Sequence, residues 1–207
     1  MTEIHAYITN SEDIPETVGR SPGWINPRYE RRYREAKIAQ QKSGALAAGL
    51  LLSCFAGIGP DEELLCNEYG KPYIPGKPFF SLSHSDGLAV LAVSHEDRVG
   101  IDIERIDRVT PRIIRKVSRF DTTSASQIEL AREWTRVEAA LKMKGTGFYS
   151  DPLKMEETGI YFSSCVFNGH LITCACETEF VLEAKFVCFE FEDNNISYKT
   201  ENIQKGL

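Results

Sequence analysis

Long apolar runs are missing from this chain of 207 residues, and so is the basic and then apolar opening of a secretory signal peptide. No apolar run approaches the roughly 20 residues that a helix needs to cross a bilayer. The net charge is −6, so the basic excess that is typical of a general nucleic-acid binder is missing too. We therefore expect a cytoplasmic protein that binds neither membranes nor nucleic acid.

Paired cysteines with CxxC spacing are also absent. A structural zinc site takes four closely spaced ligands, and disulfides are rare in cytosolic proteins. We therefore expect reduced thiols that pack in the core. The six cysteines are scattered along the chain at Cys54, Cys66, Cys165, Cys174, Cys176 and Cys188.

The sequence does contain an ordinary globular composition, with 42% hydrophobic and 26% charged residues. Apolar runs bounded by turn residues, and alternation at 99–104, predict strands at 1–8, 79–83, 88–94, 99–104, 160–167, 171–177 and 184–191. Helical spacing predicts helices at 28–35, 42–55, 111–117 and 123–144, the last starting later if Ser126 and Glu129 form a capping box. Asn168-Gly169 predicts a tight hairpin turn, and the polar tail from Glu192 is expected to fray. This order predicts an α+β fold of two similar halves, 1–97 and 98–207.

The segment from Val99 to Glu104 alternates apolar and acidic residues, which is the period of a half-buried strand. Asp102 and Glu104 lie two residues apart, so we expect them side by side on an exposed strand face. Two such carboxylates repel each other unless a cation lies between them. The pair alone is common and is weak evidence for a site.

A third carboxylate, Glu138, lies on the longest predicted helix, four residues before Lys142. At this spacing the two side chains are neighbours, and on the helix alone an ordinary surface ion pair is the better interpretation. They lie at the edge of an apolar face that we expect to be core. That face consists of Gln127, Leu130, Trp134, Val137 and Leu141.

Two loops carry further polar side chains. Lys71 is held on a stiff loop, because Pro72 restricts it to extended conformations, and taken alone it is best interpreted as an exposed lysine. His84 follows a strand end, where contact with a phosphate and contact with a turn carbonyl are about equally supported.

Four motifs give these residues a more specific meaning. In order, they are Asn67-x-x-Gly70-Lys71-Pro72, Phe80-Ser81-Leu82-Ser83-His84-Ser85, Gly100-Ile101-Asp102-Ile103-Glu104, and Trp134-Thr135-Arg136-Val137-Glu138-Ala139-Ala140-Leu141-Lys142. Together they resemble the 4'-phosphopantetheinyl transferases, specifically the larger type similar to the surfactin-synthetase activator. The similarity runs from about Arg28 to Gly147. One departure is Val137, where the family often has lysine.

The resemblance implies a pseudo-twofold α+β fold, with coenzyme A and magnesium bound in the cleft between the halves. It implies transfer of the 4'-phosphopantetheine arm of coenzyme A to a serine of an apo acyl or peptidyl carrier protein. The other product would be adenosine 3',5'-bisphosphate. A monomer is expected, because one chain already holds both halves.

The resemblance also assigns the coenzyme A contacts. Lys71 and His84 would contact the phosphates, with Ser83 beside them, and Lys42 matches a basic position that the family uses on the nucleotide. Lys142 would stabilise or protonate the leaving phosphate. The resemblance also suggests Arg28, Arg31 and Arg32 as helpers.

Asp102, Glu104 and Glu138 would hold the metal. Three hard carboxylate ligands suit Mg²⁺, which keeps waters and takes the rest of its shell from substrate phosphate. No soft ligand is present to favour zinc. Glu138 would also take the proton of the serine nucleophile, directly or through a metal-bound water.

Two other classes of protein stay open. One is a different Mg²⁺-dependent enzyme, which would use the same carboxylates on a nucleotide diphosphate without a protein acceptor. The other is a non-catalytic homologue that binds carrier proteins and has kept only the fold.

The docking surface for a carrier must be local, because carriers of this kind are generally acidic and this chain is acidic too. The predicted helix 111–117 offers basic residues for this contact. An alternative of equal weight is a solvated helix whose apolar residues Ile113, Ile114 and Val117 belong to the core. The basic residues are Arg112, Arg115, Lys116 and, just beyond, Arg119.

Overall fold

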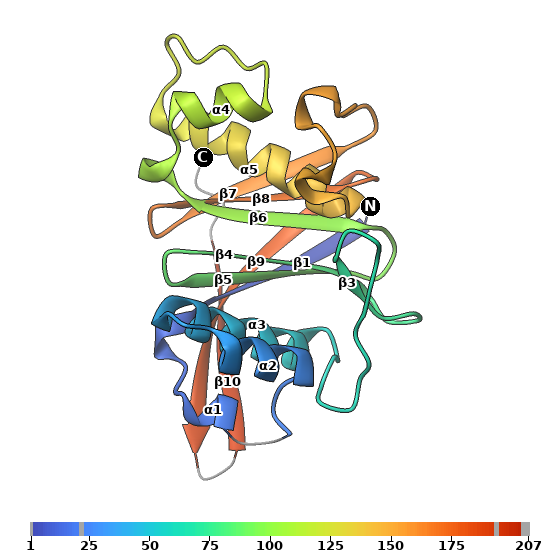
Figure 1. Cartoon of the computed structure of the whole chain (residues 1–207), viewed down its shortest axis with the longest axis vertical. Helices are drawn as coiled ribbons and strands as arrows, with labels where there is room; N and C mark the ends of the chain where they lie inside the picture. The colour runs from blue at the N-terminus through green and yellow to red at the C-terminus, as the bar shows by residue number, and fades with distance from the viewer. Residues whose placement is uncertain (1, 21–22, 193–194, 204–207) are drawn as a thin grey trace.

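The computed structural model describes residues 2–20, 23–192 and 195–203 (Figure 1). It is a mixed α+β fold, as predicted. The helices are α1 (Thr17–Arg20), α2 (Pro27–Glu35), α3 (Ala39–Phe55), α4 (Pro111–Val117) and α5 (Gln127–Lys144), with 3-10 turns η1 (Ser11–Asp13), η2 (Ile106–Arg108), η3 (Gly147–Tyr149) and η4 (Pro152–Lys154). The strands are β1 (Thr2–Asn10), β2 (Leu65–Cys66), β3 (Pro72–Tyr73), β4 (Phe79–Ser85), β5 (Leu88–Ser94), β6 (Val99–Arg105), β7 (Tyr161–Phe167), β8 (His170–Cys176), β9 (Phe180–Glu192) and β10 (Asn195–Asn202).

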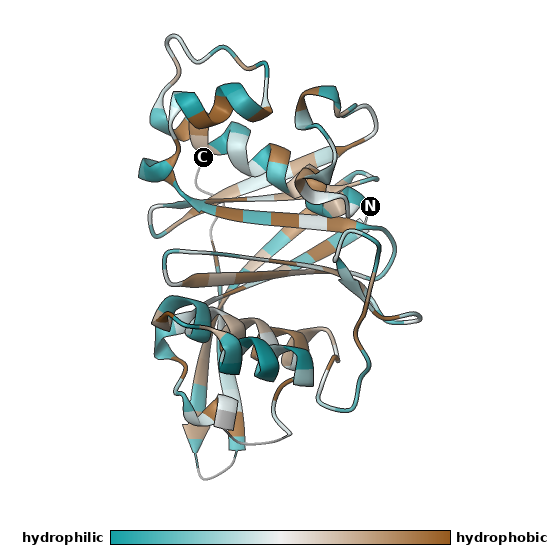
Figure 2. Cartoon of the chain, in the orientation of Figure 1, coloured by the Kyte–Doolittle hydropathy of each residue, from teal (hydrophilic) through white to brown (hydrophobic). Residues whose placement is uncertain are grey.

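Two sheets form the centre of the molecule, with strand orders β10-β9-β1-β5-β4 and β6-β8-β7, and β2 pairs with β3 apart from them. In Figure 1, α2 and α3 lie below the five-stranded sheet and α5 lies above the three-stranded sheet. Apolar residues of β1 and β5 pack against those of β6 and β8, for example Val90, Ile101 and Ile172. Figure 2 shows the contrast between β5, which is apolar along its length, and the largely hydrophilic α2.

The ends of α5 are fixed by local sequence. Ser126 and Glu129 form the reciprocal capping box, so the helix begins at Gln127, later than the predicted 123. Gly145 ends it with φ of 75°, a left-handed conformation that glycine adopts at little cost. The predicted hairpin turn between β7 and β8 is confirmed, with positive φ at Asn168 and Gly169.

Gly100 allows α5 to lie directly on β6. A Cβ atom there would be 1.9 Å from the carbonyl oxygen of Ala139 and 2.4 Å from the backbone nitrogen of Met143. No side chain can therefore separate the strand from the helix at this point. The close approach brings the acidic residues of β6 next to the last turns of α5.

The polar tail is a strand for most of its length, so the prediction that it frays was wrong for residues 195–202. These residues form β10, which pairs antiparallel with β9. Ile196 packs against the hydrophobic core between the five-stranded sheet and helices α2 and α3. The ring centroids of Tyr198 and Phe55 lie 4.7 Å apart. The apolar contacts of Ile196 and Tyr198, together with the pairing to β9, thus hold the strand. Residues 1, 193–194 and 204–207 of the predicted elements lie outside the described residues.

The segment 98–207 contributes to both sheets. Its strand β9 pairs in parallel with β1, and β10 extends that sheet further. Two strands from the second predicted half therefore complete the sheet of the first. The pseudo-twofold relation between the halves stays a prediction.

None of the six cysteines, which all lie in the described part of the chain, forms a disulfide. Cys165, Cys174 and Cys176 are buried between the sheets. The core prediction was wrong for Cys66 and Cys188, which are exposed. In the described part of the chain, no helix combines the length and the apolar character that crossing a membrane would need.

Candidate active site

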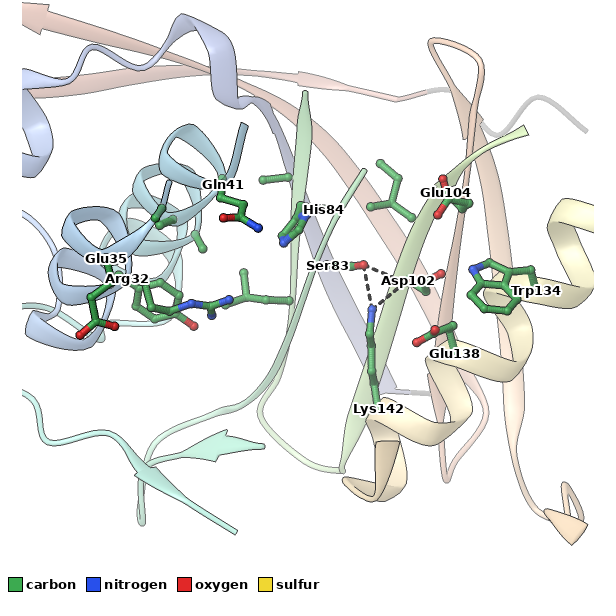
Figure 3. Close-up of a pocket in the computed structure, with 18 residues that line it drawn as sticks. Arg32, Glu35, Gln41, Ser83, His84, Asp102, Glu104, Trp134, Glu138 and Lys142 are labelled. Atoms are coloured by element: carbon green, nitrogen blue, oxygen red, sulfur yellow. Dashed lines mark hydrogen bonds and ion pairs between the residues drawn. The ribbon is translucent and has the colours of Figure 1, made fainter. Parts of the chain in front are cut away.

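A cavity of about 660 Å³ opens between the helices of the first half and α5. Strands β4 and β6 cross its middle. In Figure 3, Arg32, Gln41 and His84 lie on one side of it. Side chains from β6 and α5 lie on the other side, namely Asp102, Glu104, Trp134, Glu138 and Lys142.

Serine side chains join β4 to β6 across the boundary between the two sheets. Ser83 Oγ donates a hydrogen bond to Asp102 Oδ1 at 2.7 Å, and Ser85 Oγ donates to Glu104 Oε1 at 2.7 Å. Ser81, which lies two residues before Ser83 in β4, accepts a hydrogen bond from the backbone N–H of Ile101 in β6 at 3.1 Å. This alternation places every second side chain of β4 on the acidic strand.

Asp102 is only 4% exposed, so the expectation of an exposed acidic face was wrong for this residue. The reason is the direct packing of α5 on β6. Its Oδ1 also accepts a hydrogen bond from Lys142 Nζ at 2.6 Å. Burial raises the pKa of Asp102, and the Lys142 charge opposes that rise. Among the described residues, the second carboxylate oxygen, Oδ2, has no hydrogen-bond partner.

Glu138 lines the same cavity and is half-buried. Burial, and then the negative charge of Asp102, raise its pKa to about 7, while Lys142 opposes this. Glu104 adds a smaller repulsion of the same sign. The cavity thus concentrates three carboxylates beside one ammonium group, which favours binding of a further cation.

The donor set fits Mg²⁺, although no three acidic, histidine or cysteine side chains of the described residues form a ready metal cluster. Mg²⁺ is usually held by one or two carboxylates, with waters and substrate phosphates completing the octahedron. The unpartnered, buried Oδ2 of Asp102 is the kind of oxygen that such an ion would satisfy.

Arg32 and His84 line the opposite side. Desolvation, followed by the charges of Lys142 and Arg32, lowers the pKa of His84. Lys142 lies between the two sides, because its Nζ also bonds Ser83 Oγ at 2.8 Å. The arrangement offers positive groups to an anion and negative groups to a metal within one cavity.

Two predicted ligands lie outside this cavity. Lys42 Nζ lies 5.7 Å from the ring centroid of Tyr33. Lys71 Nζ donates to the carbonyl oxygens of Val99 at 3.0 Å and Met143 at 3.4 Å. Lys71 lines an adjoining cavity of about 260 Å³ that shares Arg32 and Lys142 with the first. The other predicted site residues lie together; they are Ser83, His84, Asp102, Glu104, Glu138 and Lys142.

Sequence reasoning missed several residues that line the cavity. Trp134 was expected in the core; it does pack against core residues of α4 and α5, but it is half-buried and also lines the cavity beside the carboxylates. The signal was its position four residues before Glu138, which puts both on one helix face. Gln41 also lines the cavity, but nothing in the sequence indicated it. Tyr29 lines the cavity too, and its position one turn before Arg32 on α2 was the signal. Gln127 was also wrongly expected in the core, since it is exposed and its amide donates to two loop carbonyls at 2.6 Å.

Val137 occupies the position where the resembled family often has lysine. It is buried and packs with Val117 of α4 and Leu141. It does not line the cavity. In this chain the position therefore serves the contact between α4 and α5.

No protein-family model matches the chain. It is similar to the 4'-phosphopantetheinyl transferase gsp of Aneurinibacillus migulanus, with 36% identity over 100 residues, 44% of this chain and 42% of that protein. The 4'-phosphopantetheinyl transferase AcpT of Salmonella typhi is 35% identical over 128 residues, 54% of this chain and 66% of that protein. A 4'-phosphopantetheinyl transferase of Bacillus subtilis is 34% identical over 92 residues, 39% of this chain and 40% of that protein.

These matches confirm the resemblance that the four motifs predict. The chain is an α+β protein with an acidic cavity at the junction of two sheets. Over the matched regions it is similar to 4'-phosphopantetheinyl transferases. The matched region spans less than half the length of the gsp and Bacillus subtilis proteins.

Proposed function

We propose that this protein moves the 4'-phosphopantetheine arm of coenzyme A to a serine hydroxyl of an apo carrier protein in the presence of Mg²⁺. The observation that carries the proposal is the cavity in which Asp102, Glu104 and Glu138 face Lys142 and His84. The names of the homologues support the same reaction. Breaking a diphosphate requires this combination of metal ligands and cations.

The cationic side of the cavity is the side for the coenzyme A phosphates. Arg32 and His84 approach it from the first half, and Lys142 approaches from the second. Burial first, and then the positive charges of Lys142 and Arg32, lower the pKa of His84, so part of the shift comes from cations on this side. An anion with several phosphate groups would relieve this repulsion.

Asp102, Glu104 and Glu138 are the residues that would hold Mg²⁺. The free Oδ2 of Asp102 and the raised pKa of Glu138 both support this role. When bound, Mg²⁺ supplies neutralisation of the negative charge on the diphosphate oxygens.

Glu138 is the general base of the proposed reaction. A pKa of about 7 makes it a good proton acceptor near neutral pH. It takes the proton of the carrier serine, whose oxygen bonds to the phosphorus that carries the pantetheine arm. The bond from this phosphorus to the bridging oxygen breaks, and adenosine 3',5'-bisphosphate leaves. Lys142 Nζ, held at 2.6 Å from Asp102, donates to the leaving phosphate.

The partner is an apo acyl or peptidyl carrier protein, and the active unit is a monomer in the cytoplasm. The exposed basic side chains of α4 form the docking surface for this acidic partner. They are Arg112, Arg115 and Lys116 on the helix and Arg119 after it.

The test is incubation of the protein with coenzyme A, Mg²⁺ and an apo carrier, followed by mass spectrometry of the carrier. A gain of one phosphopantetheine arm is expected. A carrier in which alanine replaces the acceptor serine is the matched control and should gain nothing. Cleavage of coenzyme A without a carrier would instead indicate another Mg²⁺-dependent enzyme. Carrier binding without modification would indicate a non-catalytic homologue.

A further inference from the structure

The loop between β2 and β3 turns back onto the C-terminal end of α5. Asn67 closes this loop, because its Oδ1 accepts the backbone N–H groups of Tyr69 at 3.0 Å and Lys71 at 2.8 Å. The Nδ2 of the same side chain donates to the carbonyl oxygen of Gly145 at 2.8 Å. One side chain thus orders the loop and binds it to the helix end.

Lys71 makes a second connection between the same elements. Its Nζ donates to the carbonyl oxygen of Met143 in the last turn of α5 and to that of Val99 at the start of β6. A cation at a helix C-terminus satisfies free carbonyls and interacts favourably with the helix dipole. Burial lowers the pKa of Lys71 to about 8, so its ammonium group is held in a partly desolvated position.

The backbone at the helix end fits closely against this loop. A Cβ atom on Gly145 would lie 2.9 Å from Asn67 Nδ2 and 3.2 Å from Lys71 Cδ. The N–H of Gly145 itself bonds to the carbonyl oxygens of Leu141 and Lys142. The contact is therefore made three residues, or about one helical turn, after Lys142, whose Nζ bonds Ser83 and Asp102.

We propose that Asn67 and Lys71, which we name the α5 latch, are positioning residues that hold the last turn of α5 against β6. The latch thereby sets the place of Lys142 Nζ between Ser83 and Asp102. This inference rests on the proposed function, in which Lys142 acts on the leaving phosphate. It gives Lys71 a role different from the coenzyme A contact that the family resemblance implies.

The positions of the donors favour positioning over ligand binding. Lys71 does not line the larger cavity, and two of its three ammonium protons are directed at carbonyl oxygens. Binding a phosphate would compete with contacts that join both elements of the site. Lys142, in contrast, lines both cavities.

The first test separates substrate binding from turnover in Lys71→Met, which removes the ammonium group and keeps most of the stem. The coenzyme A dissociation constant should stay within about twofold, the usual scatter of independent effects. The turnover number should fall by about 10-fold to 100-fold, because small misplacements of a catalytic group are costly. A large rise in the dissociation constant with nearly native turnover would overturn the proposal in favour of direct binding.

The matched control is Lys77→Met. Lys77 Nζ also donates to a backbone carbonyl, that of Gly57 at 3.1 Å, but on the side of α3. This variant should keep native turnover. In a Lys142→Met background, Lys71→Met should lower the remaining rate little further, because both act through the same side chain. If the rate losses of the two single variants multiplied fully in the double variant, the latch proposal would be contradicted.

A second measurement does not depend on activity. Hydrogen exchange at the amides of Gly145 and Thr146, both bonded to Leu141, should accelerate in Lys71→Met and in Asn67→Ala but not in Lys77→Met. Unchanged exchange in both latch variants would overturn the proposal. If the wild type transfers no phosphopantetheine, the proposed function fails, whereas the exchange data still decide whether the latch exists.

Discussion

At the scale of single residues, Asp102 is the side chain on which most of the proposed contacts in the cavity depend. Its Oδ1 accepts from both Ser83 and Lys142, and its Oδ2 has no hydrogen-bond partner among the described residues. We expect the Asp102→Asn variant to fold. Its transfer rate should fall by more than about 100-fold, because the substitution removes the negative charge that the metal and Lys142 would share. Transfer assays at saturating Mg²⁺ and thermal unfolding measure the two effects.

The matched control for this variant is Asp107→Asn. Asp107 is an exposed carboxylate that accepts from Arg105 at 2.7 Å and does not line the cavity. Its loss should leave transfer unchanged. Native transfer by Asp102→Asn at low Mg²⁺ would show that the metal assignment is wrong.

Glu138 gives a pH-dependent prediction for the metal-free protein. Its folded pKa of about 7 lies above the ordinary value of 4.5, so the folded state binds the proton more tightly than the unfolded state. The wild type should therefore lose stability as pH rises from about 4.5 to about 7. Glu138→Gln removes this loss and should gain relative stability across the window, by about 3 kcal/mol at most.

Denaturant unfolding in chelator at several pH values measures this difference. Glu68→Gln, an exposed carboxylate outside the cavity, controls for the loss of one negative charge. A stability difference between Glu138→Gln and wild type that does not change with pH would refute the account of the Glu138 carboxylate.

The sequence indicates only part of the site's geometry. Strand alternation places Asp102 and Glu104 on one face, and helical spacing makes Glu138 and Lys142 neighbours. Their assignment to one site came from the resemblance of the four motifs and stays a prediction. The burial of Asp102 could not be predicted, because it depends on how closely α5 approaches Gly100. The carbonyl contacts of Lys71 depend on the same packing, and no local pattern encodes them.

At the scale of elements, α4 has the buried apolar side that one interpretation of the sequence predicts, and its role in carrier docking stays a prediction. Ile114 and Val117 are buried, whereas Arg112 and Arg115 are exposed. We expect Arg112→Glu with Arg115→Glu to slow modification of an acidic carrier by about tenfold or more at low salt, because charges at the edge of an interface mainly set the association rate. Coenzyme A affinity should not change.

Stopped-flow or initial-rate measurements at limiting carrier concentration test this surface. Charge reversal at Lys199, an exposed lysine of β10, is the control for net charge. Equal carrier rates for wild type and the α4 double variant would place docking elsewhere, for instance at the loop after Gly147.

The C-terminal end of α5 allows a stability test of the latch contact. Gly145→Ala and Gly159→Ala both force alanine to positive φ, which costs about 1–2 kcal/mol. Only Gly145 has latch atoms close to the new Cβ, whereas Gly159 has none within 4 Å. We expect the larger loss in free energy of unfolding at Gly145, measured by urea titration. Equal losses of unfolding free energy in the two variants would mean that the loop moves away from the new Cβ atom without cost.

Elements were predictable where their signals are local. The capping box and Gly145 define α5, and Asn168-Gly169 defines the hairpin. The strand β10 was missed, because its apolar residues Ile196 and Tyr198 are few and its stability comes from pairing with β9. Tertiary pairing of this kind has no signature in a short polar segment.

At the scale of the whole molecule, the chain returns to its starting sheet. The parallel pairing of β9 with β1 joins segments almost 180 residues apart, as in the register Thr2 with Phe180. A sequence pattern can predict each strand but not this long-range partner. The pairing ties the second half to the first and supports a fixed geometry for a site built from both.

The central claim is that this cavity transfers phosphopantetheine with the help of a divalent metal. The most direct measurement is the mass of an apo carrier after incubation with coenzyme A, Mg²⁺ and either wild type or Glu138→Gln. The account predicts one added arm with wild type, lost on chelation of the metal and lost in the variant, because Glu138 both accepts the serine proton and holds the metal. An unmodified carrier with wild type, or equal modification by Glu138→Gln, would contradict it.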